Sequence, residues 1–122
     1  MPAMRGTLYI MLKEPCPGRV KTRLGHEIGH VGAAWWFRHQ STRLIRALGR
    51  DPRWRAVLAV SPDSAVAARV WGPTLPRVPQ GGGDLGARMT RLLRHAPPGP
   101  TLIVGGDIPE VTPARIARAF DA

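Results

Sequence analysis

The chain has 122 residues, enough for one domain built around a single hydrophobic core. Hydrophobic residues make up 43% of it and charged residues 21%, which is ordinary globular usage and excludes a disordered chain. No apolar run reaches the roughly 18–20 residues that cross a bilayer, and the N-terminus lacks the pattern of a signal peptide. Its one cysteine, Cys16, excludes an intrachain disulfide and suits a reducing compartment, so we expect a cytoplasmic protein.

The formal net charge of +10 raises the question of a nucleic-acid partner. All basic residues except Lys13 and Lys21 are arginines, and they are scattered along the chain rather than massed in one block. With a single tyrosine, the sequence also lacks the alternation of aromatic and basic side chains that binds single strands. The charge therefore favours an anionic small molecule, such as a nucleotide, over a nucleic acid.

The predicted elements alternate between strands and helices. Short apolar runs rich in β-forming residues predict buried strands at 7–12, 54–60, 75–78 and 101–104. Apolar periodicity, caps and first-turn prolines predict helices at about 27–48, 62–70, 84–94 and from 113 to the end. Residues 13–23 are predicted to form a loop, because Pro15, Pro17 and Gly18 break any regular element there.

This alternation predicts a mostly parallel sheet with helices on both faces. Ligands bind such sheets at the carboxyl ends of the strands. Each glycine-rich or charged segment of this chain follows a strand at that end. The sequence therefore predicts an α/β domain that binds a ligand at one edge of its sheet.

The first segment that can carry chemistry lies in the predicted loop after the first strand. Arg19, Lys21 and Arg23 are two residues apart, so in an extended loop all three project to one side. Arginine offers bidentate contacts and lysine a point charge, a donor set that suits a di- or triphosphate. A solvated basic loop is the alternative interpretation.

The second segment is the glycine run that precedes the third predicted helix. Gln80 is followed by Gly81, Gly82 and Gly83, which allow a ligand to approach the backbone closely. A flexible turn is the alternative. Asp84 is expected to cap the helix rather than act as a catalytic acid. Arg88, one turn into the helix, can reach a phosphate or pair with an acid at the surface.

The third segment is the end of the last predicted strand. Asp107 follows Gly105 and Gly106, and small residues beside a carboxylate leave room for a hard cation and its phosphate ligands. An aspartate that caps the next turn is the alternative. The histidines show no zinc-ligand spacing with a cysteine, and no serine stands in a Gly-x-Ser-x-Gly context, so neither a zinc site nor a hydrolase nucleophile is expected.

The runs PCPGRVKTRL, QGGGDLGARM and IVGGDIP, in this order and spacing, resemble the DUF2064 family. Its members are also called selenodomain-associated transferases or arsenosugar-biosynthesis-type glycosyltransferases, within the nucleotide-diphospho-sugar transferase (GT-A) superfamily. The resemblance covers nearly the whole chain and implies a three-layer Rossmann-like GT-A fold. Family members continue further, so residues 1–122 are expected to form a nucleotide-binding α/β domain that is the N-terminal part of a longer transferase domain, with a sheet incomplete at its C-terminal end.

The resemblance also implies roles for individual residues. Arg19, Lys21 and Arg23 would hold the nucleotide phosphates, the 80–83 segment would approach the base, and Asp107 would ligate Mg²⁺ or Mn²⁺. The implied reaction is transfer of a glycosyl group from a nucleotide-sugar to a small-molecule acceptor. Two alternatives stay open: nucleotidyl transfer from an NTP with release of pyrophosphate, and a truncated nucleotide-binding module without turnover.

Overall fold

The computed structural model describes residues 5–13, 30–67, 71, 75–106 and 111–121, without the side chains of 30–35 and 37. Its strands and helices alternate, as the sequence predicts. In chain order they are β1 (Gly6–Lys13), α2 (His30–Gly49), β2 (Trp54–Ser61), the 3-10 helix η1 (Asp63–Ala67), β3 (Arg77–Pro79), α3 (Leu85–His95), β4 (Thr101–Gly105) and α4 (Pro113–Asp121).

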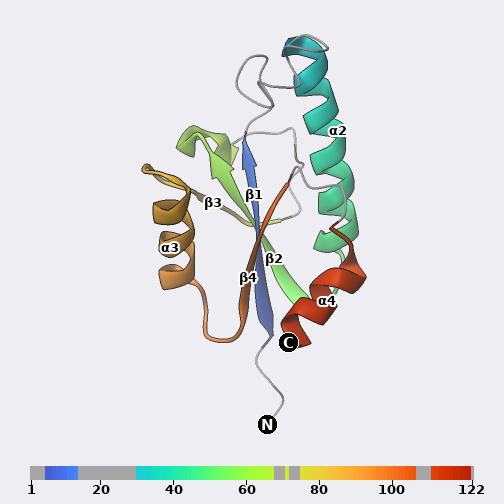
Figure 1. Cartoon of the computed structure of the whole chain (residues 1–122), viewed down its shortest axis with the longest axis vertical. Helices are drawn as coiled ribbons and strands as arrows, with labels where there is room; N and C mark the ends of the chain where they lie inside the picture. The colour runs from blue at the N-terminus through green and yellow to red at the C-terminus, as the bar shows by residue number, and fades with distance from the viewer. Residues whose placement is uncertain (1–4, 14–29, 68–70, 72–74, 107–110, 122) are drawn as a thin grey trace.

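The described strands form one parallel sheet in the order β3-β2-β1-β4, so β1 lies between β2 and β4. Helices α2 and α4 cover one face of the sheet and α3 covers the other, which gives three layers (Figure 1). The chain moves outward from β1 to β3 and then crosses back to β4. Because parallel crossovers are right-handed, this change of direction accounts for α3 lying on the opposite face. The predicted α/β class is confirmed.

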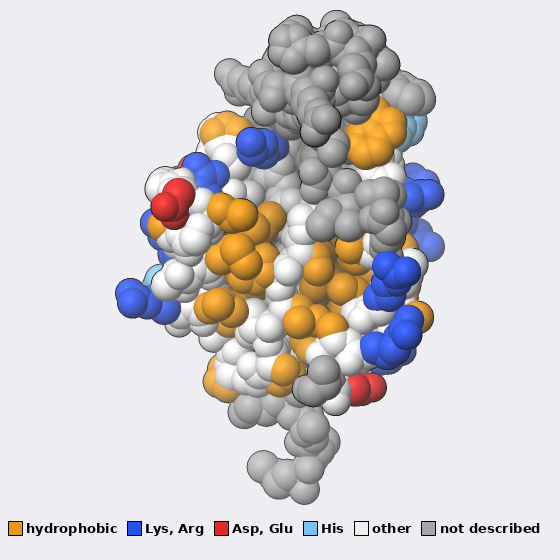
Figure 2. Space-filling view, in the orientation of Figure 1, with side chains coloured by type: hydrophobic (Ala, Val, Ile, Leu, Met, Phe, Trp, Pro, Cys, Tyr) orange, Lys and Arg blue, Asp and Glu red, His pale blue; other side chains and the backbone are white. Residues whose placement is uncertain are grey.

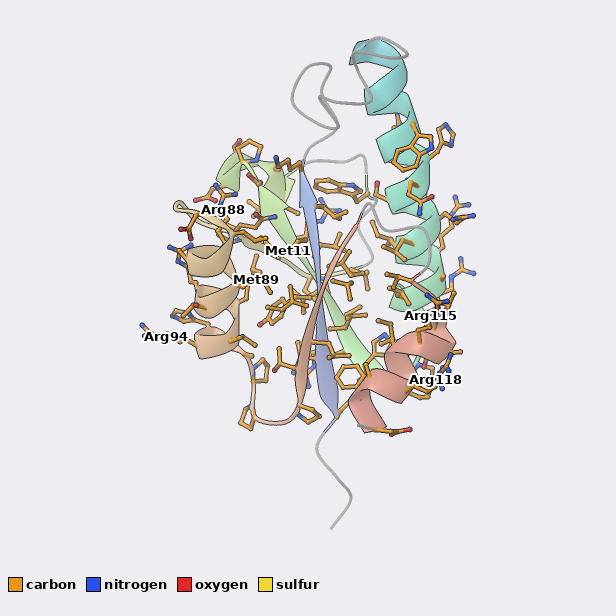
Figure 3. All side chains as sticks on the ribbon, in the orientation of Figure 1. Met11, Arg88, Met89, Arg94, Arg115 and Arg118 are labelled. Atoms are coloured by element: carbon orange, nitrogen blue, oxygen red, sulfur yellow. The ribbon has the colours of Figure 1, made fainter. Side chains whose placement is uncertain are left out.

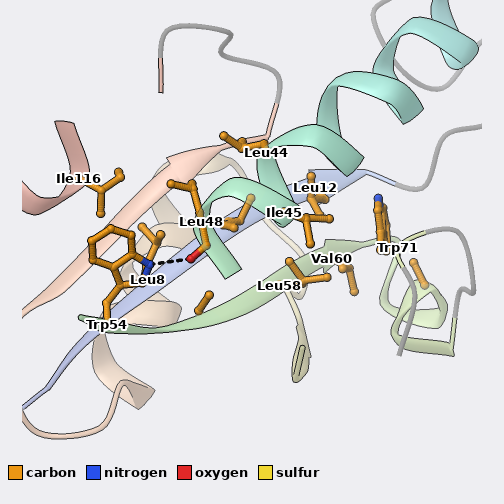
Figure 4. Close-up of a cluster of buried hydrophobic side chains, with 13 residues drawn as sticks. Leu8, Leu12, Leu44, Ile45, Leu48, Trp54, Leu58, Val60, Trp71 and Ile116 are labelled. Carbon is orange, nitrogen blue, oxygen red and sulfur yellow. Dashed lines mark hydrogen bonds between the residues drawn. The ribbon is translucent and has the colours of Figure 1, made fainter. Parts of the chain in front are cut away.

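The larger part of the core fills the face under α2 and α4. Leu8, Ile10 and Leu12 of β1 point into it and are almost completely buried, together with apolar residues of β2, α2 and α4. The Trp54 indole Nε1 donates a hydrogen bond to the Leu48 carbonyl oxygen at 2.9 Å and so joins β2 to the end of α2 (Figure 4). The bond gives the indole N–H an acceptor, which it needs because Trp54 is only 1% exposed to water.

The opposite face carries a smaller cluster, in which Tyr9, Val57 and Ala59 pack with Leu92 of α3. Burial raises the pKa of the Tyr9 hydroxyl above its ordinary value. Strand β1 is therefore buried on both faces, as a central parallel strand is expected to be. This explains why residues 8–12 form an uninterrupted apolar run instead of an alternating one.

Strand β4 differs, because all five of its residues are half-buried. In the described part of the chain it pairs with β1 on one side and lies at the end of the strand order on the other. Figure 2 shows hydrophobic side chains exposed on both sides of this strand. No described helix has the length and apolarity needed to span a membrane.

Two predicted elements differ from those observed. The helix predicted for 62–70 is a 3-10 helix over Asp63–Ala67, with the Ala65 N–H donating to the Pro62 carbonyl; residues 68–70 lie outside the described part. The predicted strand at 75–78 is displaced to Arg77–Pro79. The hydrogen bonds between β2 and β3 begin at the Pro76 carbonyl, which accepts from the Leu58 N–H. Proline has no N–H to donate, so Pro76 can join the ladder only as an acceptor.

Candidate functional site

The carboxyl ends of the parallel strands meet at one edge of the sheet, the upper edge in Figure 1. Strand order reverses there, since the chain runs from β1 to β3 on one side and places β4 on the other. Open parallel sheets bind ligands at such a reversal point. The candidate site therefore comprises the segments that follow β1, β3 and β4.

The structure describes part of the predicted site. The 80–83 segment and Arg88 are described, and the structure brings them together next to the ends of β1 and β2. The other predicted site residues lie outside the described part of the chain: Arg19, Lys21, Arg23 and Asp107.

Gln80 joins three elements at this edge and is 4% exposed. Its side-chain Nε2 donates to the carbonyl oxygens of Leu12, at 3.2 Å, and Ala59, at 2.9 Å. Its Oε1 accepts a bond from Arg88 at 3.0 Å. The side chain thus connects the ends of β1 and β2 to α3, and its predicted approach to a base stays a prediction.

The three glycines of the loop differ in what requires them. Gly81 and Gly83 have φ angles of 78° and 95°, in the region that favours glycine. A Cβ at Gly81 would meet the Arg91 guanidinium, and one at Gly83 would lie 2.9 Å from the Ala87 Cβ. Gly82 is exposed, and a Cβ there would meet no atom within 4 Å. Backbone conformation and close packing therefore explain why Gly81 and Gly83 are glycines. Gly82 has neither constraint and borders open space.

The Arg88 guanidinium is held by neutral oxygens. Its Nε donates to the Gly83 carbonyl at 2.9 Å, and one terminal nitrogen donates to Gln80 Oε1 at 3.0 Å and to Ser61 Oγ at 3.3 Å. Arg53, by contrast, forms an ion pair with the Asp51 carboxylate. Figure 3 places Arg88 at the upper end of α3, toward the carboxyl edge. The result is a fixed positive charge that no described carboxylate neutralises.

The two carboxylates of the loop region are bonded to backbone N–H groups. Asp84 caps α3, accepting from the Ala87 N–H at 2.8 Å, so the predicted capping role is confirmed. Asp63 of η1 accepts from the Gly81 N–H at 3.0 Å. Both side chains therefore shape the backbone around the glycine loop.

Sequence reasoning missed Ser61, Asp63 and Arg91 as neighbours of the loop. A terminal nitrogen of Arg91 donates to the carbonyl oxygens of Gln80 and Gly82, the latter at 3.2 Å. The i, i+3 spacing of Arg88 and Arg91 on one helix is the signal that could have found this residue, because such positions share a face.

The described residues bring together no three His, Cys, Asp or Glu side chains that could hold a metal ion. The predicted metal ligand, Asp107, directly follows the last described residue of this segment. Gly106 donates its N–H to the Met11 carbonyl at 2.9 Å, and a side chain there would meet Leu12. Close packing of the β4 end against β1 therefore requires this glycine.

Comparison with known families gives a direct match. A family model described as "Uncharacterized protein conserved in bacteria (DUF2064)" matches residues 44–122. The chain belongs to the DUF2064 family. The part of this DUF2064 chain that matches includes the glycine loop, Arg88 and the whole of β4. No curated protein matches it.

A solved structure gives the fold. The crystal structure of a "putative nucleotide-diphospho-sugar transferase" from Desulfovibrio desulfuricans G20 superposes with a TM-score of 0.86 at 28% identity. The match covers 97% of this chain and 54% of that chain, so the DUF2064 chain spans about half the length of its solved relative. The predicted GT-A-like fold is confirmed.

Proposed function

We propose that this DUF2064 chain binds a nucleotide-sugar and transfers the glycosyl group to an acceptor. The observation that carries the proposal is Arg88, whose charge is held at the carboxyl edge of the sheet by three neutral oxygens. A cation that is fixed in place and lacks a counter-charge is suited to a phosphate, because little conformational entropy is lost on binding. The name of the solved relative supports the nucleotide-sugar as the anion.

The remaining roles follow from the sequence. In this proposal Arg19, Lys21 and Arg23 hold the phosphates together with Arg88, and the glycine loop meets the base. Asp107 ligates Mg²⁺ or Mn²⁺. Such a cation neutralises charge on the leaving diphosphate. Positioning and electrostatic stabilisation supply most of the catalysis.

A binding experiment tests the site. UDP, GDP, CDP and their sugars are titrated against the purified chain by calorimetry, with and without Mn²⁺. We expect one nucleotide to bind in a metal-dependent manner and to lose affinity in Asp107→Ala, Lys21→Ala and Arg88→Gln. Arg94→Gln, an exposed position two turns further along α3, is the matched control and should bind as the wild type does. Absence of binding by every nucleotide contradicts the proposal.

A turnover experiment separates the alternatives. Release of free nucleoside diphosphate from a nucleotide-sugar with Mn²⁺ supports glycosyl transfer. Consumption of an NTP with release of pyrophosphate supports nucleotidyl transfer instead. Binding without either product supports a nucleotide-binding module that does not turn over.

A further inference from the structure

We propose that the outer surface of helices α2 and α4 binds the phosphate backbone of duplex DNA without reading its sequence. Five exposed arginines form this surface, which we call the arginine face: Arg43, Arg46, Arg50, Arg115 and Arg118. The first two belong to α2, Arg50 directly follows that helix, and the last two belong to α4. The arginine face is separate from the candidate nucleotide site and does not depend on the proposed function.

The arginines of α2 lie opposite its buried side chains. Leu44, Ile45 and Leu48 fill the core beneath the helix. Arg43 and Arg46 are exposed, and at about 100° per residue they lie on the opposite side of the helix. Arg50 continues their spacing, i, i+3 and i+7, one residue after the helix ends. The result is a row of positive charge along the outside of α2.

Helix α4 repeats this arrangement. Ile116 is buried, whereas Arg115 and Arg118 are exposed and lie on the other side of the helix (Figure 3). Because α2 and α4 cover the same face of the sheet and share one hydrophobic cluster, their outer sides form one surface. Figure 2 shows Lys and Arg side chains along the right-hand margin, over these two helices. The fold thus gathers arginines whose scattering in the sequence argues against a nucleic acid.

The two helices contain little negative charge. The α2 sequence has no aspartate or glutamate, and the α4 sequence has one, Asp121, at its last position. Arginine presents a planar set of donors that matches the oxygens of a phosphate. A surface that gathers charge of one sign attracts a ligand of the opposite sign. The arginine face therefore suits a polyanion with many phosphates.

The exposed hydrophobic residues argue against a protein or a membrane as the partner. Within the described residues, the large hydrophobic side chains that are exposed belong to η1 and α3: Val66, Leu85 and Leu93. Protein interfaces have an apolar core, and stable attachment to a membrane needs an apolar anchor beside the basic residues. A nucleic acid needs neither, because its phosphates supply most of the affinity.

The same surface favours a DNA double helix over other nucleic acids. Trp36 and Phe120 pack against the core, so these aromatic rings do not form a platform for single-stranded bases. From Arg43 to Arg50 the helical rise is about 10 Å, close to the roughly 12 Å width of the major groove of DNA. Arginines at the two ends of the row can therefore reach phosphates on both strands. The major groove of A-form RNA is too narrow for this.

Two double variants separate the arginine face from net charge. Arg43→Gln/Arg46→Gln removes two charges from the arginine face. Arg55→Gln/Arg94→Gln is the matched control and removes two exposed charges from the other side of the sheet. Arg94 belongs to α3, and Arg55 alternates along β2 with side chains that point toward α2. Because these four side chains are exposed, we expect both variants to unfold at the wild-type midpoint.

Binding is measured by fluorescence anisotropy of a labelled, mixed-sequence DNA duplex of about 20 base pairs, at several salt concentrations. Five phosphate contacts predict a slope of about −4.5 for the logarithm of the association constant against that of the salt concentration. Arg43→Gln/Arg46→Gln should reduce the slope to about −2.7 and weaken binding at least about tenfold at low salt. The control should keep the wild-type slope and an affinity within about twofold of wild type.

Other results overturn the inference. Equal weakening in the two double variants means that net charge alone attracts DNA. Tighter binding of duplex RNA, single-stranded DNA, polyglutamate or anionic phospholipid vesicles assigns the arginine face to another partner. A wild-type chain that does not bind the DNA duplex also overturns it. Calorimetry with the nucleotide should give wild-type affinity for Arg43→Gln/Arg46→Gln, so each of these failures leaves the proposed function intact.

Discussion

Two arginines at opposite edges of the sheet show how differently this molecule uses the same side chain. Arg53 precedes β2 at the amino edge, where its Nε and one terminal nitrogen bind the two Asp51 carboxylate oxygens at 2.9 and 2.7 Å. Its guanidinium also lies over the Trp54 ring, 5.1 Å from the centroid. Arg88, at the carboxyl edge, meets only neutral oxygens among the described residues.

The contrast concerns where charge is neutralised. At the amino edge the protein supplies its own anion, so the ion pair belongs to the structure and is complete without a ligand. At the carboxyl edge the guanidinium is oriented but keeps its charge, which an external anion can neutralise. The amino edge is therefore expected to govern stability and the carboxyl edge to govern binding, and each prediction tests one side of that division.

The largest expected effect is on stability, at the amino edge. Trp54→Ala removes a ring that is 1% exposed, hydrogen-bonded to Leu48 and stacked on Phe120 at 5.9 Å between centroids. Burial of this size predicts a loss of about 3–5 kcal/mol in the free energy of unfolding, measured by urea denaturation. Trp54→Phe keeps most of the packing and should lose less. A variant as stable as the wild type would contradict the assignment of this edge to stability.

The next effect is on binding, at the carboxyl edge. Arg88→Gln removes the positive charge that we assign to binding the nucleotide phosphates. A charge-assisted hydrogen bond contributes about 1.5–3 kcal/mol, so its loss should weaken nucleotide binding roughly 10–100-fold. Calorimetry measures this change in affinity. Arg53→Gln is the matched substitution at the other edge and should leave the affinity unchanged. Equal losses in the two variants would mean that net charge, rather than position, attracts the nucleotide.

A smaller effect separates capping from chemistry at the carboxyl edge. Asp84→Ala removes the oxygen that accepts the Ala87 N–H, which should cost about 1 kcal/mol of the free energy of unfolding. Asp84→Asn keeps an acceptor there and should recover most of the loss. Turnover by the folded Asp84→Ala chain should stay within a fewfold of wild type. A loss of turnover without a loss of stability would instead make Asp84 a catalytic acid.

The smallest effect is the pH dependence of the amino-edge ion pair. The side-chain hydrogen bond from Arg53 is the main cause that lowers the pKa of Asp51 below its ordinary value of 3.8. A carboxyl with a lowered folded-state pKa contributes stability above its unfolded pKa and loses it as the pH falls through the folded one. Unfolding midpoints of Asp51→Asn and wild type should therefore converge below that range. A difference that persists in acid would assign the effect to packing.

Much of the fold follows from local chemistry that the sequence displays. Strand β1 is apolar because both its faces are buried, and the Asp84 cap and the Thr112-Pro113 start of α4 are visible as motifs. The sequence predicts the start of β3 two residues too early, at 75 instead of Arg77, because prolines surround the strand and its ladder begins at the Pro76 carbonyl. Here a tertiary bond rather than a local preference sets the boundary.

The candidate site was less predictable, since its decisive contacts join distant segments. The approach of Gln80 to a base stays a prediction, and what the sequence does not show is that its carboxamide binds carbonyls of β1 and β2, 68 and 21 residues away in the chain. Arg91 resembles every other arginine in a sequence rich in them. Its i, i+3 spacing from Arg88 places the two on one helix face, and the path of the backbone then brings that face to the glycine loop.

The central place of β1 has a consequence for how the chain is made. Thr7 pairs with Arg55 on one side and with Thr101 on the other, so β1 gains its β4 neighbour only after 101 − 7 = 94 further residues have been translated. Until then one edge of a strongly apolar strand has no native partner. An unpaired strand edge of this kind promotes aggregation and binding by chaperones. Contacts so distant in sequence also slow folding. The yield of this protein in a cell is therefore expected to depend on the time between the emergence of β1 and the emergence of β4.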